Sequence, residues 1–250
     1  MRVRPSSFAV FLKRCFPVPR VTVGAENCTF LVDPISHFGR ALLDEGRYEP
    51  EITETLKRRL FPGATFVDVG ANEGFFSILA GGLVGSGGRV IAIEPQQRLQ
   101  SVIAKNAEMN ELTNLEVHQV AISDSEDILD LHLAPDVNTG GSALARATRY
   151  PVATQRVTTM TLTRFFEIAG IERVDLMKMD IEGFEYEAIL GSKDIFKSGR
   201  VGGLALELHP PALSRRNHSA DEIVRFLESS GYERDATTPN TVFLWNKARQ

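Results

Sequence analysis

Cysteine is scarce in this sequence of 250 residues, which contains only Cys15 and Cys28. Both lie in the N-terminal segment, in a pattern that indicates neither a metal cluster nor a disulfide framework. Because free thiols persist in reducing compartments, the simplest expectation is a cytoplasmic protein.

An excess of positive charge is also lacking. The chain has 28 Lys and Arg residues against 32 Asp and Glu residues, for a net charge of −4. Binding to nucleic-acid phosphates needs a concentrated basic surface, whereas the basic residues here are scattered among acidic ones. We therefore predict that nucleic acid is not a partner, although a local basic groove is compatible with this average.

Long apolar runs are missing from the first 20 residues, which hold five basic residues and no acidic one. The longest apolar run there, Phe8 to Leu12, is too short for a signal-peptide core or a membrane span. We favour a surface helix that packs Phe8, Val10, Phe11 and Phe16 on the domain or on a second subunit of a homo-oligomer. The alternative is a basic arm that contacts a membrane face or an anionic substrate.

The chain does contain enough apolar sequence for one large core. Hydrophobic residues make up 43% and charged residues 24% of the sequence, as in soluble globular domains. We find no internal repeat and no low-complexity tract. We predict an N-terminal extension over residues 1–45, with one or two short strands between Val21 and Asp33, followed by one catalytic domain over residues 46–250.

The most informative stretch runs from Thr65 to Glu94. An apolar run from Thr65 to Val69 predicts a strand, and a glycine-bounded turn then leads into an apolar helix from Phe75 to Ala80. A second strand ends on Glu94. This succession predicts a βαβ unit.

The turn of this unit has the form of a ligand-binding turn. Gly70 and Gly74 let the backbone pass close to a bound molecule, where a Cβ atom would collide. Asp68 and Glu94 place carboxylates at the ends of adjacent strands, and a carboxylate at the second strand end is the usual partner of a ribose diol. The alternative is that the two glycines serve only the geometry of a tight turn.

The turn sequence Asp-Val-Gly-Ala-Asn-Glu-Gly, residues 68–74, selects among nucleotide-like cofactors. A dinucleotide fold binds pyrophosphate through G-x-G-x-x-G, and this turn lacks the close glycine pair. Asp68 and Glu73 would repel a pyrophosphate but suit a ligand that bears an ammonium and a sulfonium group. S-adenosylmethionine (SAM) is such a ligand and is the predicted cofactor, whereas a nicotinamide-dependent oxidoreductase is disfavoured.

Four motifs, in this order, resemble the motif series of FkbM-type SAM-dependent methyltransferases, a family named for a macrolide O-methyltransferase: FVDVGANEGFFS, IAIEP, VDLMKMDIEGFE and LALELHP. The resemblance covers about Gly46 to Trp245. It implies that SAM is bound by the turn, by the second strand end, by the loop after the third strand and by the fourth strand end. The cofactor-binding residues expected there are Asp68, Gly70, Ala71, Asn72, Gly74, Phe75, Phe76, Glu94, Pro95, Ala121, Ile122, Ser123 and Asp180.

Strand and helix patterns alternate along the chain and finish with a hairpin. They predict a Rossmann-like, doubly wound and mostly parallel α/β sheet of the class I methyltransferase type, seven-stranded with an antiparallel last strand. Further helices are expected at residues 46–56, 99–110, 185–190 and 220–230. Further strands are expected at residues 115–121, 128–133, 152–157, 174–180, 201–208, 232–236 and 241–245.

Two other segments are expected near the ligand. The helix that opens at residues 46–56 either places Tyr48 or Glu49 near the methionine end of SAM or is a charged, solvated face. The loop from Pro135 to Pro151 is long enough to be a binding lid. Its residues 140–142 resemble a glycine-serine element of the family, so Ser142 is a candidate contact of the cofactor or the substrate.

The fourth and fifth strand ends carry the candidate chemistry. Neighbouring strands run about 4.8 Å apart, so Asp180 and Glu207 are expected side by side, and Glu207 and His209 should leave the same face of one strand. We predict Asp180, Glu182 and His209 as catalytic residues, with His209 as a general base oriented by Glu207.

Two other arrangements of these residues remain open. Asp180 and Glu207, with or without His209, would hold Mg²⁺ or a similar ion that polarises an acceptor hydroxyl. Alternatively, Glu207 is a buried structural acid bonded to a backbone amide or to a lysine such as Lys178.

The resemblance implies an O-methyltransferase that acts on a hydroxyl of a small molecule, a sugar or a secondary metabolite. Methylation of nucleic-acid bases is disfavoured, because the fourth strand ends in Asp-Ile-Glu-Gly instead of the Asn/Asp-Pro-Pro-aromatic motif of base-methylating enzymes. A non-catalytic SAM-binding or scaffold protein is the main alternative, but it would have no reason to keep polar residues at the later strand ends.

Overall fold

The computed structural model describes residues 18–144, 153–238 and 241–249. The predicted basic arm and Cys15, up to residue 17, lie outside the described residues, as does the predicted lid loop from residue 145 onward. Among the helices that the structure describes, none is both long enough and apolar enough to cross a membrane.

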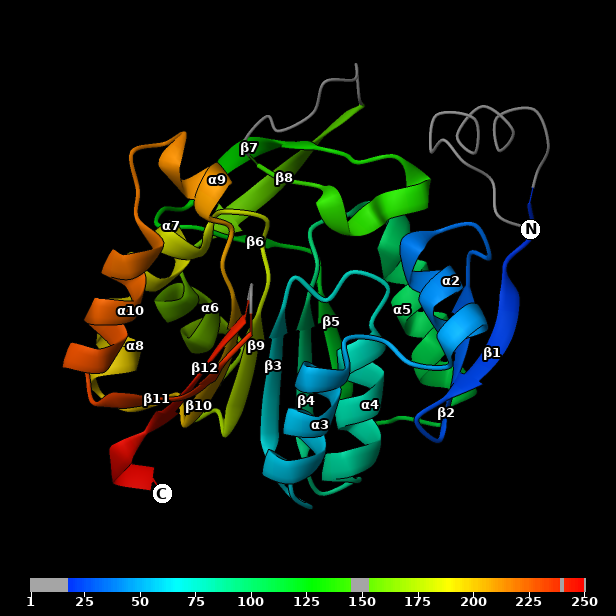
Figure 1. Cartoon of the computed structure of the whole chain (residues 1–250), viewed down its shortest axis with the longest axis horizontal. Coiled ribbons are helices and arrows are strands. Elements are labelled where there is room, and N and C mark those ends of the chain that lie inside the picture. Colours follow the sequence, from blue (N-terminus) through cyan, green and yellow to red (C-terminus); the bar gives the residue numbers. More distant parts are fainter. Residues whose placement is uncertain (1–17, 145–152, 239–240, 250) are drawn as a thin grey trace.

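A seven-stranded sheet forms the centre of the molecule, as predicted (Figure 1). Its strand order is β11-β12-β10-β9-β3-β4-β5, and β12 runs antiparallel between β10 and β11, whereas β10, β9, β3, β4 and β5 are parallel neighbours. The strands are β3 (Thr65–Val69), β4 (Arg89–Ile93), β5 (Leu115–His118), β9 (Leu176–Met179), β10 (Gly203–Glu207), β11 (Tyr232–Thr237) and β12 (Thr241–Asn246). This is the predicted class I methyltransferase topology.

Both faces of the sheet are apolar and both are covered by helices, because alternate residues of each strand point to opposite faces. In β3, Phe66 packs into one core cluster, and Val67 and Val69 pack into the other. The first cluster includes α2 (His37–Glu45), α3 (Pro50–Arg59) and α4 (Phe75–Val84). The second includes α6 (Leu162–Ile168), α7 (Glu185–Leu190), α8 (Lys193–Lys197) and α10 (Ala220–Ser229). Short helical turns complete the chain at η1 (Asp136–Gly141), α9 (Pro210–Ser214) and η2 (Lys247–Arg249).

The N-terminal extension forms a two-stranded hairpin, β1 (Val21–Ala25) and β2 (Cys28–Val32), which packs on α4 and α5 (Gln97–Met109). Asn106 of α5 and Asn110, the residue after this helix, bind the free edge of β2. Asn110 Oδ1 accepts from the Thr29 amide at 2.8 Å, and Asn106 Oδ1 accepts from the Leu31 amide at 2.7 Å. Phe30 shares the core cluster of α4. The described part of the extension is thus continuous with the core of the catalytic domain, and a domain boundary at residue 45 stays a prediction.

The prediction of a single strand at residues 115–121 is wrong, because this segment contributes to two strands that belong to two different sheets. The chain leaves the main sheet after β5, and β6 (Ala121–Ile122) joins a separate three-stranded sheet with β8 (Thr154–Met160) and β7 (Asp127–His132). Val120 and Ile122 remain buried in the core at the bend, which explains why the apolar pattern reads as continuous. The small sheet lies toward the carboxyl ends of the main strands (Figure 1).

The carboxyl ends of β3 and β9 are joined through Gly70. The amide of Asp180 donates to the carbonyl of Val69 at 3.0 Å, and Gly70 has a left-handed backbone with φ of +83°. A Cβ atom at Gly70 would lie 1.9 Å from the carbonyl oxygen of Asp180. The expectation that this glycine makes room for a ligand therefore needs correction, since the atom it makes room for belongs to the protein.

This contact predicts a loss of stability in Gly70→Ala even without any ligand. A backbone clash together with an unfavourable positive φ should lower the free energy of unfolding by about 2 kcal/mol or more. The matched control is Gly82→Ala in α4, where a Cβ atom meets nothing within 4 Å. That change should raise stability by about 0.5 to 1 kcal/mol, because alanine is the better helix former. Urea unfolding of both variants measures the difference, and equal stabilities would contradict the contact.

Candidate active site

Two pockets open at the carboxyl end of the sheet and share Gly70, Asn72 and Asp180. We name them the Glu94 pocket and the Glu49 pocket. Among the predicted cofactor residues, those that line the Glu94 pocket are Gly70, Asn72, Glu94, Pro95, Ala121, Ile122 and Asp180. Those that line the Glu49 pocket are Gly70, Ala71, Asn72, Phe75, Phe76 and Asp180. Asp68, Gly74 and Ser123 line neither.

Glu94 follows β4 directly and is held in one orientation by the backbone. Its side chain is 3% exposed, its Oε2 accepts from the amide of Asn72 at 2.8 Å, and its Oε1 accepts from the amide of Gln96 at 2.9 Å. Burial raises the pKa of Glu94, and the two amides act in the opposite direction by favouring the carboxylate. The carboxylate is therefore fixed toward the pocket before any ligand binds.

The segment that includes η1 closes over the Glu94 pocket. Thr139 Oγ1 donates to Asn72 Oδ1 at 2.7 Å, and Gln96 Nε2 donates to the carbonyl of Thr139 at 3.2 Å. Gly140 and Ser142 line the pocket from this segment. The described part of the predicted lid thus borders the pocket, whereas residues 145–151 of that loop lie outside the described residues.

Aromatic side chains and acidic groups make up the Glu49 pocket. The Tyr48 ring lies 5.3 Å from that of Phe75 and 6.0 Å from that of Phe76, measured between ring centroids. Glu49 Oε2 and Asp180 Oδ1 are buried and accept no hydrogen bond from the residues that the structure describes. Burial raises the pKa of Glu49. Of the two interpretations of the 46–56 segment, the solvated face is therefore wrong for Glu49.

The two acids predicted to attract a cationic ligand have partners inside the protein. Asp68 is fully buried, its Oδ2 accepts from Ser77 Oγ at 2.6 Å, and its Oδ1 lies 3.9 Å from Lys178 Nζ. Glu73 is buried and pairs with Arg20 of the extension. At the Glu49 pocket, Glu49 Oε2 and Asp180 Oδ1 are buried carboxylate oxygens that accept no hydrogen bond from the described residues. Asp68 is thus corrected from a cofactor contact to a partner of Lys178.

Asp180, Glu182 and His209 converge beside the shared edge of the pockets, and we name them the His209 cluster. His209 Nε2 lies 3.7 Å from Asp180 Oδ1 and 3.6 Å from Glu182 Oε2. His209 Nδ1 lies 3.0 Å from Oε1 of Glu185, which is fully buried at the start of α7. Burial alone would lower the pKa of His209, but the hydrogen bond to Glu185 and the charges of the three carboxylates outweigh it and raise the pKa to about 9.

Two details of the predicted catalytic geometry are corrected. β10 ends at Glu207, and His209 lies beyond it as the residue that precedes α9. The carboxylate that orients the imidazole is Glu185, which the sequence analysis missed, and not Glu207. The role of His209 as a metal-free general base stays a prediction.

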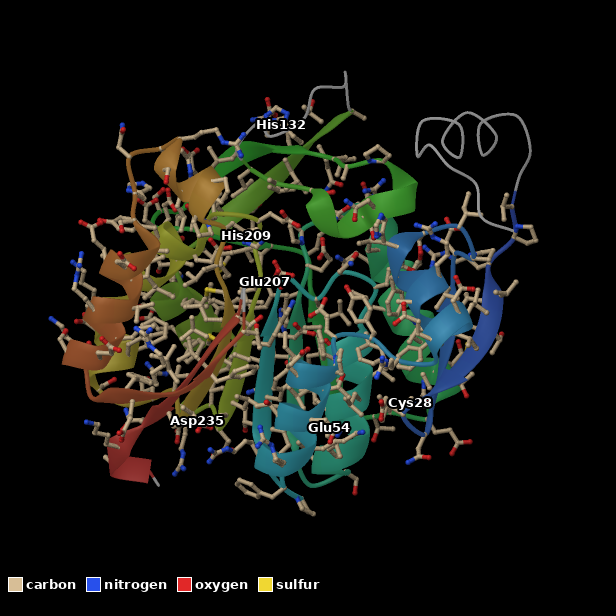
Figure 2. The ribbon with its side chains drawn as sticks, in the orientation of Figure 1. Cys28, Glu54, His132, Glu207, His209 and Asp235 are labelled. Atoms are coloured by element: carbon tan, nitrogen blue, oxygen red, sulfur yellow. The ribbon has the colours of Figure 1, made fainter. Side chains whose placement is uncertain are left out.

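Glu207 lies near His209 at the carboxyl end of the sheet (Figure 2), but it is not a member of the His209 cluster. Burial and the charges of Asp180 and Glu49 raise the pKa of Glu207 to about 7. It makes no hydrogen bond or ion pair with the described residues, so it is not the structural acid bonded to Lys178. The described residues that come together as a possible metal-ligand set are Asp180, Glu182 and His209, with ligand atoms within 4.8 Å of one another, and not the predicted pair Asp180 and Glu207.

Several pocket residues were not predicted. Gln96 lies two residues after Glu94, and its backbone amide donates one of the two hydrogen bonds that orient the Glu94 carboxylate. Val120, Leu131, Ile181 and Phe184 add apolar surface to the Glu94 pocket. The signal for Gln96 and Phe184 was present, since they lie two and four residues after the predicted strand ends at Glu94 and Asp180. Leu131 comes from the separate small sheet, and no local pattern connects that sheet to the pocket.

Comparison with known proteins gives matches of unequal extent. The sequence matches the family model of the methyltransferase FkbM domain over residues 68–234. One segment is 43% identical over 61 residues to a probable cobalt-precorrin-6B C(15)-methyltransferase (decarboxylating) of Sulfolobus acidocaldarius, covering 24% of this chain and 32% of that protein. The AMB antimetabolite synthetase AmbE of Pseudomonas aeruginosa is 24% identical over 210 residues, covering 69% of this chain and 10% of that protein. The match thus spans about a third of the length of the first relative and about a tenth of the second.

Among solved structures, methyltransferase FkbM from Methylobacillus flagellatus KT is similar with a TM-score of 0.47 and 16% identity. The match covers 86% of this chain and 62% of that chain. The family match includes the glycine turn, Glu94, Asp180 and His209, and extends over more than half of the sequence. The chain therefore belongs to the methyltransferase FkbM family of SAM-dependent methyltransferases.

Proposed function

We propose that the protein is a SAM-dependent O-methyltransferase that methylates a hydroxyl group of a small molecule, a sugar or a secondary metabolite. The observation that carries this proposal is the junction of two chemically different pockets at Gly70, Asn72 and Asp180, with the His209 cluster beside it. SAM has a nucleoside at one end and an amino acid at the other. When bound, it supplies an electrophilic methyl group on a positively charged sulfur.

The Glu94 pocket suits the nucleoside end. Glu94 is a buried carboxylate already aimed at the pocket by two backbone amides, and its remaining lone pairs suit the two hydroxyls of a ribose. Val120, Ala121, Ile122 and Leu131 offer an apolar surface to a base. These contacts support the predicted roles of Glu94, Ala121 and Ile122.

The Glu49 pocket suits the amino-acid end. An ammonium group can donate three hydrogen bonds, and Glu49 Oε2 is a buried acceptor without a donor among the described residues. Leaving such an oxygen unpaired is costly, so a cationic ligand would be favoured there. This open acceptor is the reason to assign the ammonium group of SAM to Glu49 rather than to Asp68.

The reacting end of the site must align an acceptor and remove its proton. Alignment of a nucleophile with the transferred group contributes about 7 to 11 kcal/mol at best, and a positioned base adds about 10² to 10⁴ in rate. We assign alignment of the acceptor to Asp180, Glu182 and His209, which border the pocket junction. Glu207 lies at this sheet edge and makes no hydrogen bond or ion pair with the described residues, and we assign to it the acceptance of the hydroxyl proton.

The assignment of transfer to oxygen follows the O-methyltransferase for which the family is named, and a proton acceptor at this sheet edge is consistent with it. Methylation of a neutral hydroxyl releases its proton, and we assign the uptake of that proton to Glu207. The relative from Sulfolobus acidocaldarius is named a C-methyltransferase, but the similarity to it covers 24% of this chain. The acceptor chemistry is therefore not inferred from that relative.

Glu94→Ala tests the nucleoside end of the proposed site. Loss of hydrogen bonds to a charged group should cost about 1.5 to 3 kcal/mol, so the Kd for SAM should rise roughly 10- to 100-fold. Glu116→Ala is the matched control, because it makes the same substitution outside the pockets. Glu116 lies on the next strand and pairs with Arg89 at the surface. Calorimetric titration with SAM gives both values. Binding that is indifferent to the loss of Glu94 would contradict the assignment.

Glu49→Gln separates the two ends of the ligand. The variant should bind SAM and S-adenosylhomocysteine roughly tenfold more weakly, because both carry the ammonium group that Glu49 is proposed to hold. It should bind 5′-methylthioadenosine as the wild type does, since that compound lacks the amino-acid part. Titration of both proteins with all three compounds is the measurement. An equal loss for all three would place Glu49 in the folding of the pocket and not at the ammonium group.

Glu207→Gln tests the reaction itself. Wild-type protein supplied with methyl-labelled SAM and a panel of hydroxylated sugars and macrolactones should label at least one acceptor as a methyl ether. Glu207→Gln should lower kcat about 10² to 10⁴-fold with SAM affinity unchanged, and Glu222→Gln on the exposed face of α10 should leave kcat unchanged. A product methylated on carbon, identified by mass spectrometry and NMR, would contradict the proposed O-methylation.

A further inference from the structure

We propose that Asp180, Glu182 and His209 bind a divalent first-row transition-metal ion. The three side chains come from the end of β9, from the turn that follows it and from the residue before α9, and they present one imidazole nitrogen and two carboxylate oxygens to a common point. Binding of the ion does not depend on the proposed methyl transfer. Its use in that reaction would rest on the proposed function.

The two separations from His209 Nε2 are closer to those between metal ligands than to those between hydrogen-bonded partners. His209 Nε2 lies 3.7 Å from Asp180 Oδ1 and 3.6 Å from Glu182 Oε2, whereas a direct N–H···O bond measures about 2.7 to 3.2 Å. Two ligands held about 2.1 Å from a tetrahedral ion lie about 3.4 Å apart. The observed separations are therefore close to those around a shared cation.

The imidazole of His209 is oriented by a carboxylate, as is usual for histidine ligands of metal ions. Glu185 Oε1 lies 3.0 Å from His209 Nδ1 and also accepts from the amide of Gly183 at 2.9 Å. Because Glu185 Oε1 already accepts from this amide, we assign it as the acceptor and Nδ1 as the donor between Glu185 and His209. This leaves Nε2 facing the carboxylates of Asp180 and Glu182. A carboxylate that fixes the second nitrogen is the usual support of a histidine ligand.

The turn that contains Glu182 has an unfavourable backbone conformation that neighbouring residues hold in place. Glu182 has a left-handed backbone with φ of +54°, which is unfavourable for a residue with a side chain. Arg216 holds this turn from the α9 side, since its guanidinium donates to the carbonyl of Gly183 and to Glu187 Oε1. The backbone strain at Glu182 is thus maintained by packing, as is common where a side chain serves a site.

The ligand set selects the class of ion. Two carboxylate oxygens and one imidazole nitrogen favour a first-row transition metal over Mg²⁺, which prefers oxygen ligands throughout. Three protein ligands leave coordination positions open to water or to an oxygen of a substrate. Asp180 borders both pockets and Glu182 borders the Glu94 pocket, so in the proposed reaction the ion would polarise the acceptor hydroxyl.

The test is a metal titration of the untagged, chelator-treated full chain, without SAM and without an acceptor. Co²⁺ is followed by its visible absorption, and Zn²⁺ and Mg²⁺ are followed by calorimetry. We expect one equivalent of Co²⁺ or Zn²⁺ to bind, at least tenfold more tightly than Mg²⁺. His209→Ala and Glu182→Gln should weaken binding at least 100-fold, and Glu185→Gln should weaken it roughly 10- to 100-fold through the orientation of the imidazole.

His218→Ala is the matched control. His218 Nε2 lies 3.3 Å from Glu187 Oε1, but its ring stacks on Tyr186 and Glu187 is shared with Arg216. This variant should bind Co²⁺ as the wild type does. Circular dichroism establishes that each variant is folded.

No binding by the wild type, or binding that His209→Ala leaves unchanged, would overturn the metal site. The same preparations titrated with SAM keep the two proposals apart. SAM binding without metal binding overturns the metal site alone, and metal binding without SAM binding overturns the proposed function alone.

Discussion

The rest of the site depends on the interactions of the buried ammonium group of Lys178. The side chain is 4% exposed, and its Nζ donates to the carbonyl of Gly70 at 3.1 Å and lies 3.5 Å from Asp180 Oδ2. Burial alone would lower the pKa of Lys178, but the charges of Asp180, Asp68 and Glu49 outweigh it and raise the pKa, so the lysine stays charged. Several carboxylates at one sheet edge would otherwise repel one another at low local dielectric. The positive charge of Lys178 offsets this repulsion and allows the carboxylates to lie close together.

The difference in ligand preference between the Glu94 pocket and the Glu49 pocket follows from this arrangement. Lys178 Nζ lies 3.9 Å from Asp68 Oδ1 and donates to Asp180 Oδ2 at 3.5 Å, so Asp180 keeps Oδ1 for the pocket side. Glu94 lies on the far side of the turn and is held by amides instead of by a cation. A carboxylate that is satisfied by backbone donors suits neutral hydroxyls, whereas carboxylate oxygens without donors suit a cation. The two ends of the pocket system therefore differ in the ligand chemistry they favour.

The N-terminal extension contributes to the site from a distance. Arg20 pairs with Glu73 in the glycine turn, and Asn106 links that turn to β2 by donating to the carbonyl of Glu73 at 3.1 Å while accepting from Leu31. The hairpin of β1 and β2 thus covers the outer side of the turn whose inner side borders both pockets. Removal of the described part of the extension would expose Phe30 and its core cluster and would leave the buried acid of Glu73 without Arg20.

The sequence by itself determined the succession of elements, the glycine turn at residues 70–74 and the position of Glu94 at a strand end. These features depend on apolar periodicity and turn chemistry, which are local along the chain. Only the tertiary structure decided what each polar side chain meets. Lys178 reaches Gly70 across 108 residues, and Glu185 reaches His209 across 24. The reversal in the assignment of Asp68 and the replacement of Glu207 by Glu185 both follow from this, because a charge inside a protein is governed by whichever groups the packing places within a few ångströms, and no local pattern encodes that distance.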